Sequence, residues 1–269
     1  MRLLALLTIG ERAAFDDFER QATAIMTDHC VGIEQSFAAA PTREAHVVAF
    51  PREADFQAYR ADPRLAALAP LRSRGIVHTE IWRLTTPDRW HGPPGVYAEL
   101  IARYCEPHRR YHTVQHLEEC FLKMDEVRSL AQRPQEIESA LWFHDAIYDP
   151  RRHDNEERSA QWASNCLGGE AGQRVHDLVL ATKHAAIPEN PEARLLIDVD
   201  LSILAAPEER FDEYEAQIRE EYRWVPDFLY RRERRRILQG FLSWERIFSA
   251  AAFDEARARR NLARSLARL

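Results

Sequence analysis

From residue 96 onward, apolar residues recur at the 3.6-residue spacing of an α-helix in one segment after another. Prolines fall between these segments, where helices are expected to break. The pattern predicts helices and no strands, over residues 96–105, 114–130, 136–147, 155–166, 173–184, 194–204, 208–222, 227–248 and 254–266. Such helices can bury their apolar stripes only by packing against one another. We therefore predict an all-α domain over residues 96–269.

The first 85 residues show a different pattern. Alternating or β-branched segments predict strands over residues 3–9, 32–37, 46–50 and 75–84, and helical spacing covers 13–26 and 52–68. The order β-α-β-β-α-β is that of a ferredoxin-like fold. Residues 86–95 are rich in Pro and Gly and predict a linker. The predicted fold class is α+β, with a ferredoxin-like domain (1–85) followed by the all-α domain.

The N-terminal domain also resembles the dimeric α/β-barrel families, in which two such sheets pack face to face. Ile81 and Trp82 on the last predicted strand point to opposite faces, because side chains alternate along a strand. One of them therefore faces away from the helices, and a large exposed apolar face is unusual in a soluble monomer. We expect that face to be covered by a second copy in a homodimer, or by the helical domain of the same chain. His29, His46 and His78 lie one per element, and we expect structural or surface roles for them.

Composition narrows the class of protein. Apolar residues make up 45% and charged residues 30%, with a formal net charge of -6, so no basic field indicates a nucleic-acid partner. The basic runs at 231–236 and 257–268 carry helical spacing and are predicted to be solvated helix faces. The four cysteines form no C-x-x-C pair, which favours reduced thiols. No apolar run approaches the ~18 residues of a membrane span, so we expect a soluble, cytoplasmic protein.

Three of the predicted helical segments place polar residues within apolar sequence. These residues are His112 and His116, the adjacent pair His144 and Asp145, and Asp198 with Asp200. His112 and His116 either share a helix face or place His112 at the cap, one turn before His116. An ionised Asp within such a run is costly to bury unless it is paired or metal-bound. Convergence on one divalent cation would offset that cost, and mixed imidazole and carboxylate ligands suit Mn, Fe, Ni or Zn.

The order His, then His-Asp, then Asp is the signature of the HD superfamily of metal-dependent phosphohydrolases. Residues 104–262 resemble a bacterial family of predicted HD phosphohydrolases through segments 110–116, 140–149, 155–160, 181–184, 198–204 and 255–262. The resemblance implies one or two divalent metal ions (Mn, Mg, Fe, Ni, Co or Zn) bound by His116, His144, Asp145 and Asp200. Helical geometry also favours Asp200 over Asp198, because Asp200 shares a face with apolar residues.

Residues 111–116 are similar to the Tyr-His-Asn-x-x-His element of the cyclic-nucleotide phosphodiesterases, with Thr113 in the place of Asn. By that resemblance His112 is the general acid for the leaving group, and His116 is a metal ligand. Asp145, which could bridge two metals, would help to position the attacking water. The glutamine and the aromatic clamp that read a purine in those enzymes have no identified counterpart, so their specificity is not carried over.

Further candidates follow the His-Asp pair. Glu156 and His184 would suit a second metal or a hydrogen-bonded shell around the first, and Lys183 could hold a phosphate oxygen during catalysis. Arg109 or Arg110 could bind phosphate in the same way. A solvated surface position is the alternative for each of these residues.

The sequence therefore predicts an enzyme that hydrolyses a phosphate ester or anhydride, with a nucleotide or another small phosphorylated molecule as substrate. Two alternatives stay open. One is a di-iron oxygenase on the same scaffold, which would use additional histidines such as His184. The other is a non-catalytic binding module in which the metal only staples helices together. His112 argues against this module, because a structural site does not need another histidine one turn from a ligand.

Overall fold

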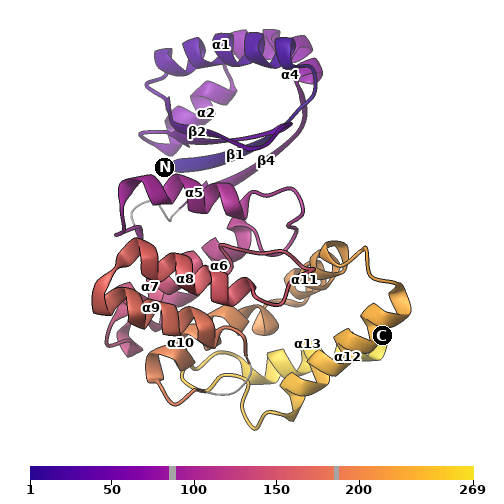
Figure 1. Ribbon diagram of the computed structural model, residues 1–269. Helices are drawn as coiled ribbons and strands as arrows, with labels where there is room; N and C mark the ends of the chain where they lie inside the picture. Colours follow the sequence, from indigo (N-terminus) through magenta and orange to yellow (C-terminus); the bar gives the residue numbers. More distant parts are fainter. Residues whose placement is uncertain (85–88, 185–187) are drawn as a thin grey trace. The chain divides into compact units, whose positions relative to one another are not determined.

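The computed structural model describes residues 1–84, 89–184 and 188–269. The chain forms two compact units: Met1–Arg89 with Tyr97–Pro107, and Trp90–Val96 with His108–Leu269. The first unit contains a β-sheet and the second is helical (Figure 1), which confirms the predicted α+β class. Part of the predicted linker, residues 86–88, lies outside the described residues.

The sheet of the first unit has four antiparallel strands in the order β2-β3-β1-β4. Their bounds are β1 (Arg2–Ile9), β2 (Gly32–Ala40), β3 (Arg43–Ala49) and β4 (Ile76–Leu84). In the central strand β1, Leu4 pairs with Val47 on one side and with Trp82 on the other. Directly paired residues point to the same face of a sheet. Trp82 therefore shares a face with Leu4, and Ile81 shares the opposite face with Ala5.

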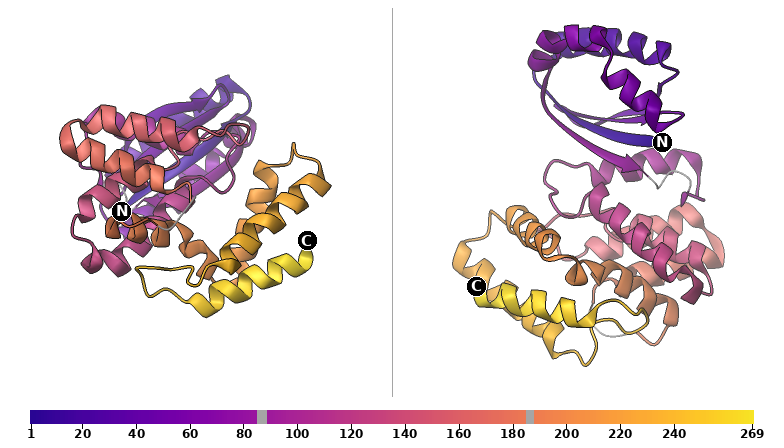
Figure 2. Two further views of the ribbon diagram at one scale, coloured as in Figure 1. Left: turned by 60° about the horizontal axis from the view of Figure 1, so that its bottom comes forward. Right: turned by 180° about the vertical axis from the view of Figure 1, so that it is seen from behind.

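Helices cover one face of this sheet. They are α1 (Arg12–Asp28), α2 (Glu53–Arg60), α3 (Pro63–Ala67) and α4 (Ala69–Gly75). In both orientations α1 and α4 lie side by side over the strands (Figure 2). The single helix predicted over residues 52–68 is wrong. It is broken ahead of Pro63, because proline lacks an N–H donor and starts helices rather than continuing them. A further helix that was not predicted, α4, follows with Pro70 in its first turn.

The face of the sheet that points away from α1 and α4 is buried within the single chain. Leu4 and Ala45 on this face are 0% exposed. Tyr97–Pro107, which includes most of α5 (Pro94–Tyr104), belongs to the same compact unit as the sheet. Apolar residues at the centre of this sheet face are thus buried by other parts of the same chain, without a second copy.

The second unit is built from helices that enclose a core around Phe211, Leu238 and Leu262. They are α6 (Val114–Val127), η2 (Arg128–Leu130), α7 (Pro134–Phe143), α8 (Asn155–Leu167), α9 (Gly169–Ala181), α10 (Pro191–Asp200), η3 (Leu201–Ala205), α11 (Glu208–Glu221), α12 (Asp227–Ser243) and α13 (Glu255–Arg268). Side-chain caps define two helix starts, with Thr113 accepting from Gln115 N and Asn190 from Glu192 N. Among helices in the described ranges, none is long and apolar enough to cross a membrane.

The end of α7 differs from the prediction in a way that matters for the site. The sequence pattern extended this helix to residue 147, whereas α7 ends at Phe143. His144 donates the last helical hydrogen bond, from its backbone N to Ala140 O at 2.8 Å. His144 and Asp145 therefore occupy the turn after the helix, not its interior. A turn can direct two adjacent side chains toward one point, which a straight helix cannot do.

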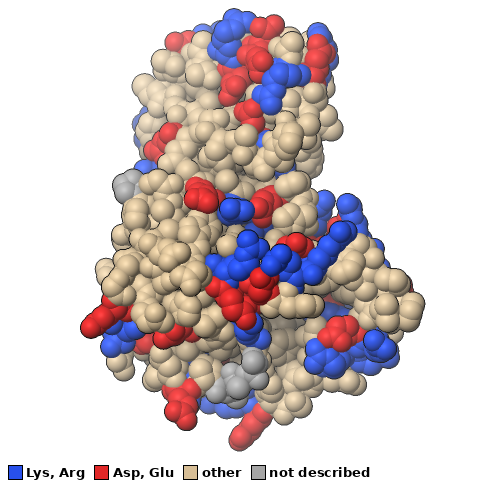
Figure 3. Space-filling view, in the orientation of Figure 1, with Lys and Arg blue, Asp and Glu red and all other residues tan. Residues whose placement is uncertain are grey.

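The two basic runs lie on α12 and α13, where several of their arginines pair with acidic side chains. Arg231 pairs with Asp227, Arg236 with Glu233, and Arg259 with Glu255. On the face shown in Figure 3, Lys and Arg side chains lie among Asp and Glu side chains. This mixing of signs is what a solvated helix surface requires.

Candidate metal centre

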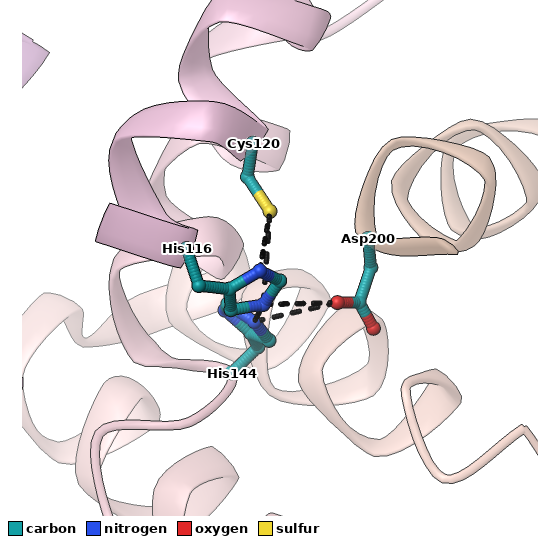
Figure 4. Close-up of side chains that lie close together, drawn as sticks. All are labelled: His116, Cys120, His144 and Asp200. Atoms are coloured by element: carbon teal, nitrogen blue, oxygen red, sulfur yellow. Dashed lines mark hydrogen bonds and ion pairs between the residues drawn. The ribbon is translucent and has the colours of Figure 1, made fainter. Parts of the chain in front are cut away.

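Four of the predicted ligands come together in the second unit. His116 lies in the first turn of α6, and Asp200 is the last residue of α10. His144 and Asp145 extend from the turn after α7. Figure 4 shows His116, His144 and Asp200 directed toward a common point from three separate segments. Helix ends thus supply most of this cluster.

The ligand atoms form a tight set. His116 Nε2 lies 3.1 Å from His144 Nε2 and 3.2 Å from Asp200 Oδ1. Asp145 Oδ2 lies 3.0 Å from His144 Nε2 and 3.6 Å from His116 Nε2. A divalent metal with bonds of about 2.0–2.2 Å holds neighbouring ligand atoms about 3.0–3.4 Å apart in octahedral or tetrahedral geometry. Most of these separations fall within that range.

The protonation of His144 also fits a metal ligand. Its Nδ1 lies 2.8 Å from the Leu141 carbonyl oxygen, which can only accept, so Nδ1 carries the proton. In the neutral ring, Nε2 then presents a lone pair to the cluster, as metal-binding histidines do. A nitrogen of His116 faces it at 3.1 Å. The buried His116, Cys120, His144 and Asp200 could accordingly hold a metal ion between them.

The carboxylates dominate the electrostatics of the cluster. Burial lowers the pKa of His144, but Asp145 and Asp200 outweigh it and raise that pKa to about 9. Burial raises the pKa of Asp145, yet His144, His112 and His116 outweigh it and bring this pKa below its ordinary value. The pKa of Asp200 is likewise well below its ordinary value. The cluster therefore favours a positive charge at its centre, which a proton or a metal ion can supply.

Cys120 is a member of the cluster that the sequence analysis missed. Its Sγ lies 3.6 Å from His116 Nδ1 and 3.8 Å from His116 Nε2 (Figure 4). It follows His116 by four residues on α6, so the His-x-x-x-Cys spacing was a signal available in the sequence. Burial raises the pKa of this thiol well above its ordinary value, which keeps it protonated when no cation is near.

His112 lies just outside the cluster and is held by a buried glutamate. It occupies the turn before α6, and its ring centroid is 6.1 Å from that of His116. Glu221 Oε2, at the end of α11, lies 2.7 Å from His112 Nδ1 and accepts from the Tyr148 hydroxyl at 2.8 Å. Burial lowers the pKa of His112, but Glu221 and Asp145 outweigh it and raise that pKa.

Arg109 serves the site in a role different from the predicted one. Its guanidinium is buried and donates to the carbonyl oxygens of His112, Asp145 and Ala146 at 2.7–3.1 Å. It thereby ties the turn before α6 to the turn after α7. The sequence left either phosphate binding or a solvated surface position open for Arg109, whereas the structure buries it with its donors directed at these carbonyls.

The other candidates lie around the cluster. His184 Nε2 is 3.1 Å from Asp200 Oδ2, the oxygen that does not face His116. Its backbone φ of 52° is left-handed, which is uncommon for histidine. Lys183 pairs with Glu157 on α8. Among the His, Cys, Asp and Glu side chains of the described residues, Glu156 lies outside the group of ligand atoms within 4.8 Å of one another, as do Asp145 and His184.

Asp198 has a structural role that its spacing from Asp200 did not reveal. Its carboxylate is 0% exposed and accepts hydrogen bonds from the backbone N–H groups of Ser249, Ala250 and Ala251 at 2.6–2.9 Å. Asp198 thus fixes the segment between α12 and α13. Asp200 points to the metal cluster from the same helix.

No protein family, curated protein or solved structure matches this chain. The HD resemblance stays a prediction made from the motifs.

Proposed function

We propose that the chain is a metal-dependent phosphohydrolase of the HD type, which cleaves a phosphate ester or anhydride. The observation that carries this proposal is a buried His-His-Asp-Asp cluster with a carboxylate-bound histidine beside it. We also propose that the second unit is an HD helical bundle and that the first unit is ferredoxin-like. The sheet order β2-β3-β1-β4 supports the second assignment.

His116, His144, Asp145 and Asp200 would hold the metal, with Cys120 beside them. A divalent ion bound there lowers the pKa of water and screens the charge on phosphoryl oxygens. His112 would protonate the departing oxygen, and its raised pKa favours the acid form that this role requires. Glu221 would orient the ring by accepting from Nδ1, which leaves Nε2 to face the substrate.

The surrounding residues would keep this arrangement rigid. Arg109 fixes the backbone on both sides of the site, and the Tyr148 ring stacks on His112 with centroids 4.2 Å apart. His184 would orient Asp200 from the far oxygen. A substrate phosphate would then meet the metal on one side and His112 on the other. A small phosphorylated molecule, such as a nucleotide, is the proposed substrate class.

One contact also favours the oxygenase alternative. His184 lies 3.1 Å from Asp200, so a second metal with His184 as a ligand would need only a local adjustment. Iron content and oxygen uptake separate the two functions. A phosphohydrolase releases phosphate and consumes no O₂. A di-iron oxygenase binds two irons per chain and consumes O₂.

The experiment that tests the proposal begins with the metal content of protein purified without added metal. A screen of phosphate esters and anhydrides under each bound metal follows. The double variant His144→Ala/Asp145→Ala should lose both metal and phosphate release, while His112→Ala should lose turnover and keep its metal. Stoichiometric metal at this centre in the double variant would contradict the site. Loss of metal in His112→Ala would make His112 a ligand instead of an acid.

A further inference from the structure

A second group of ligand-type side chains lies in the first unit, between α1 and the sheet. His46 and Glu44 are two residues apart on β3 and therefore share a face of the strand. Glu19 comes from α1, one turn after Phe15, whose ring lies 6.3 Å from the ring of His46. Helix and strand thus bring two carboxylates to one buried histidine, which is 4% exposed.

The spacing of these atoms is that of metal ligands. His46 Nε2 lies 3.2 Å from Glu44 Oε2 and 3.4 Å from Glu19 Oε1, and one ligand atom from each residue lies within 4.8 Å of the others. A charge-assisted hydrogen bond between nitrogen and a carboxylate is shorter, about 2.7–2.9 Å. Neighbouring ligands of a divalent ion lie about 3.0–3.4 Å apart.

A further contact orients one of these carboxylates. Arg12 on α1 pairs with Glu44 Oε1, which leaves Oε2 directed at His46. Metal-binding carboxylates are commonly held in this way by a second hydrogen-bonding partner. The Arg12 charge also offsets one of the two glutamates. One negative charge remains to attract a cation.

An apolar cavity adjoins the three residues. It is a second observation, separate from the distances between their ligand atoms. It has a volume of about 250 Å³ and lies between the helices and the sheet of the first unit. The charged and polar part of its wall includes His46, Glu19, Arg60 and Arg72, and the rest is mostly apolar, with side chains such as Phe15, Phe18 and Ile33. Ligand sites are commonly apolar cavities with a few placed polar groups. An ion bound by His46 would keep open positions toward this space.

We propose that Glu19, Glu44 and His46 bind a first-row divalent transition-metal ion at the wall of this cavity. One imidazole and two carboxylates suit Mn²⁺, Fe²⁺, Co²⁺ or Zn²⁺. Three protein ligands leave coordination positions for a small molecule that enters the cavity. The site is separate from the centre formed by His116 and His144, and does not depend on the proposed phosphohydrolase activity.

The test uses the full chain with Co²⁺ as the probe, followed by equilibrium dialysis and visible absorption. Glu19→Gln keeps the shape of the side chain and removes its charge. Glu34→Gln, on β2 and paired with Arg2, is the matched control. Wild type and the control should each bind one more Co²⁺ per chain than Glu19→Gln, or bind it at least tenfold more tightly. Equal binding by all three proteins would overturn the proposal.

A second pair of variants isolates the site from the centre in the other unit. A His144→Ala chain should still bind Co²⁺ through His46, and adding His46→Gln should remove that ion. A His144→Ala chain whose Co²⁺ binding is unchanged by His46→Gln would overturn the proposal. Circular dichroism of each variant confirms that the fold is retained, and Glu19→Gln gives the same comparison if His46→Gln does not fold.

Discussion

The His112 and Glu221 side chains meet at 2.7 Å between Nδ1 and Oε2, although 109 residues separate them along the chain. Glu221 Oε1 also accepts from the backbone N–H groups of Arg110, Tyr111 and His112 at 2.7–3.1 Å. One buried carboxylate therefore fixes both the turn before α6 and the ring that it carries. Burial raises the pKa of Glu221, but His112 and these hydrogen bonds outweigh it and lower the pKa to about 2.

Replacing Glu221 by Gln should shift the pH dependence of catalysis. The Glu221 charge helps to raise the pKa of His112 above its ordinary 6.5, so the acid form persists to higher pH in the wild type. Removing that charge lowers the His112 pKa. The basic limb of the kcat profile should then move to lower pH. Glu220→Gln, at the exposed neighbour paired with Arg223, is the control and should leave the profile unchanged.

The same pair affects stability at low pH. Because the folded pKa of Glu221 is below its ordinary 4.5, its charge contributes stability above pH 4.5. This contribution is lost as the pH falls from 4.5 through about 2. Glu221→Gln should therefore be less stable than the wild type at neutral pH. The difference in their free energies of unfolding should shrink in acid. A constant difference across this pH range in urea unfolding would contradict the assignment.

Replacing Asp198 should affect mainly stability, whereas replacing Asp200 should affect mainly metal binding. Asp198→Ala removes the acceptor for three backbone N–H groups and should lower the free energy of unfolding by about 3 kcal/mol, while metal is retained. Asp200→Ala should lose metal, because its Oδ1 faces His116 at 3.2 Å. Denaturant unfolding and metal analysis measure the two effects. Loss of metal in folded Asp198→Ala would show that the wrong aspartate was chosen.

Cys120→Ser should retain its metal with an affinity within a few-fold of the wild type. The buried thiol has a raised pKa, and a thiolate there would add a third anion to Asp145 and Asp200. Competition with a metal chelator measures affinity for Zn²⁺ and for Mn²⁺. A tenfold loss specific to Zn²⁺ would identify Cys120 as a ligand, because thiolates favour softer metals.

The parts of the fold that follow local patterns could be predicted from the sequence. Alternation and helical spacing located β1, α1 and α8 to within a few residues of their observed bounds. His116 and His144 could be grouped because polar residues in apolar segments need a common partner. The break ahead of Pro63 and the early end of α7 were not predicted, because the helical spacing of apolar residues continues through both points.

Contacts between distant segments could not be predicted. Nothing near Glu221 in the sequence indicates that it binds His112, and Asp198 looked equivalent to Asp200 apart from its helix face. His46 seemed isolated, because its partner Glu19 lies on another element, 27 residues earlier. Such contacts depend on the packing of whole elements, which the local spacing of residues does not reveal. The contacts of Arg109 could not be predicted for the same reason, since the three carbonyls to which it donates come from two separate turns.

Self-association through the first unit stays a proposal, and its surface can now be specified. The sheet face around Leu4 is buried within the chain, whereas the edge strand β4 exposes Val77 at 72% and Ile81 at 56%. An edge with exposed apolar residues can pair with a second copy of itself. Light scattering should therefore give about twice the 31.3 kDa chain mass at micromolar concentration. Val77→Lys should shift this to the monomer, because charge on an edge opposes pairing.

The control is Leu122→Lys on α6, which places the same charge at another exposed apolar residue, 52% exposed, in the second unit. This variant should keep the wild-type mass. If Leu122→Lys also gives monomers, the contact is not specific to β4. A wild type that is monomeric at every concentration would remove the dimer altogether. The sheet face around Leu4 would then be covered by its own chain alone.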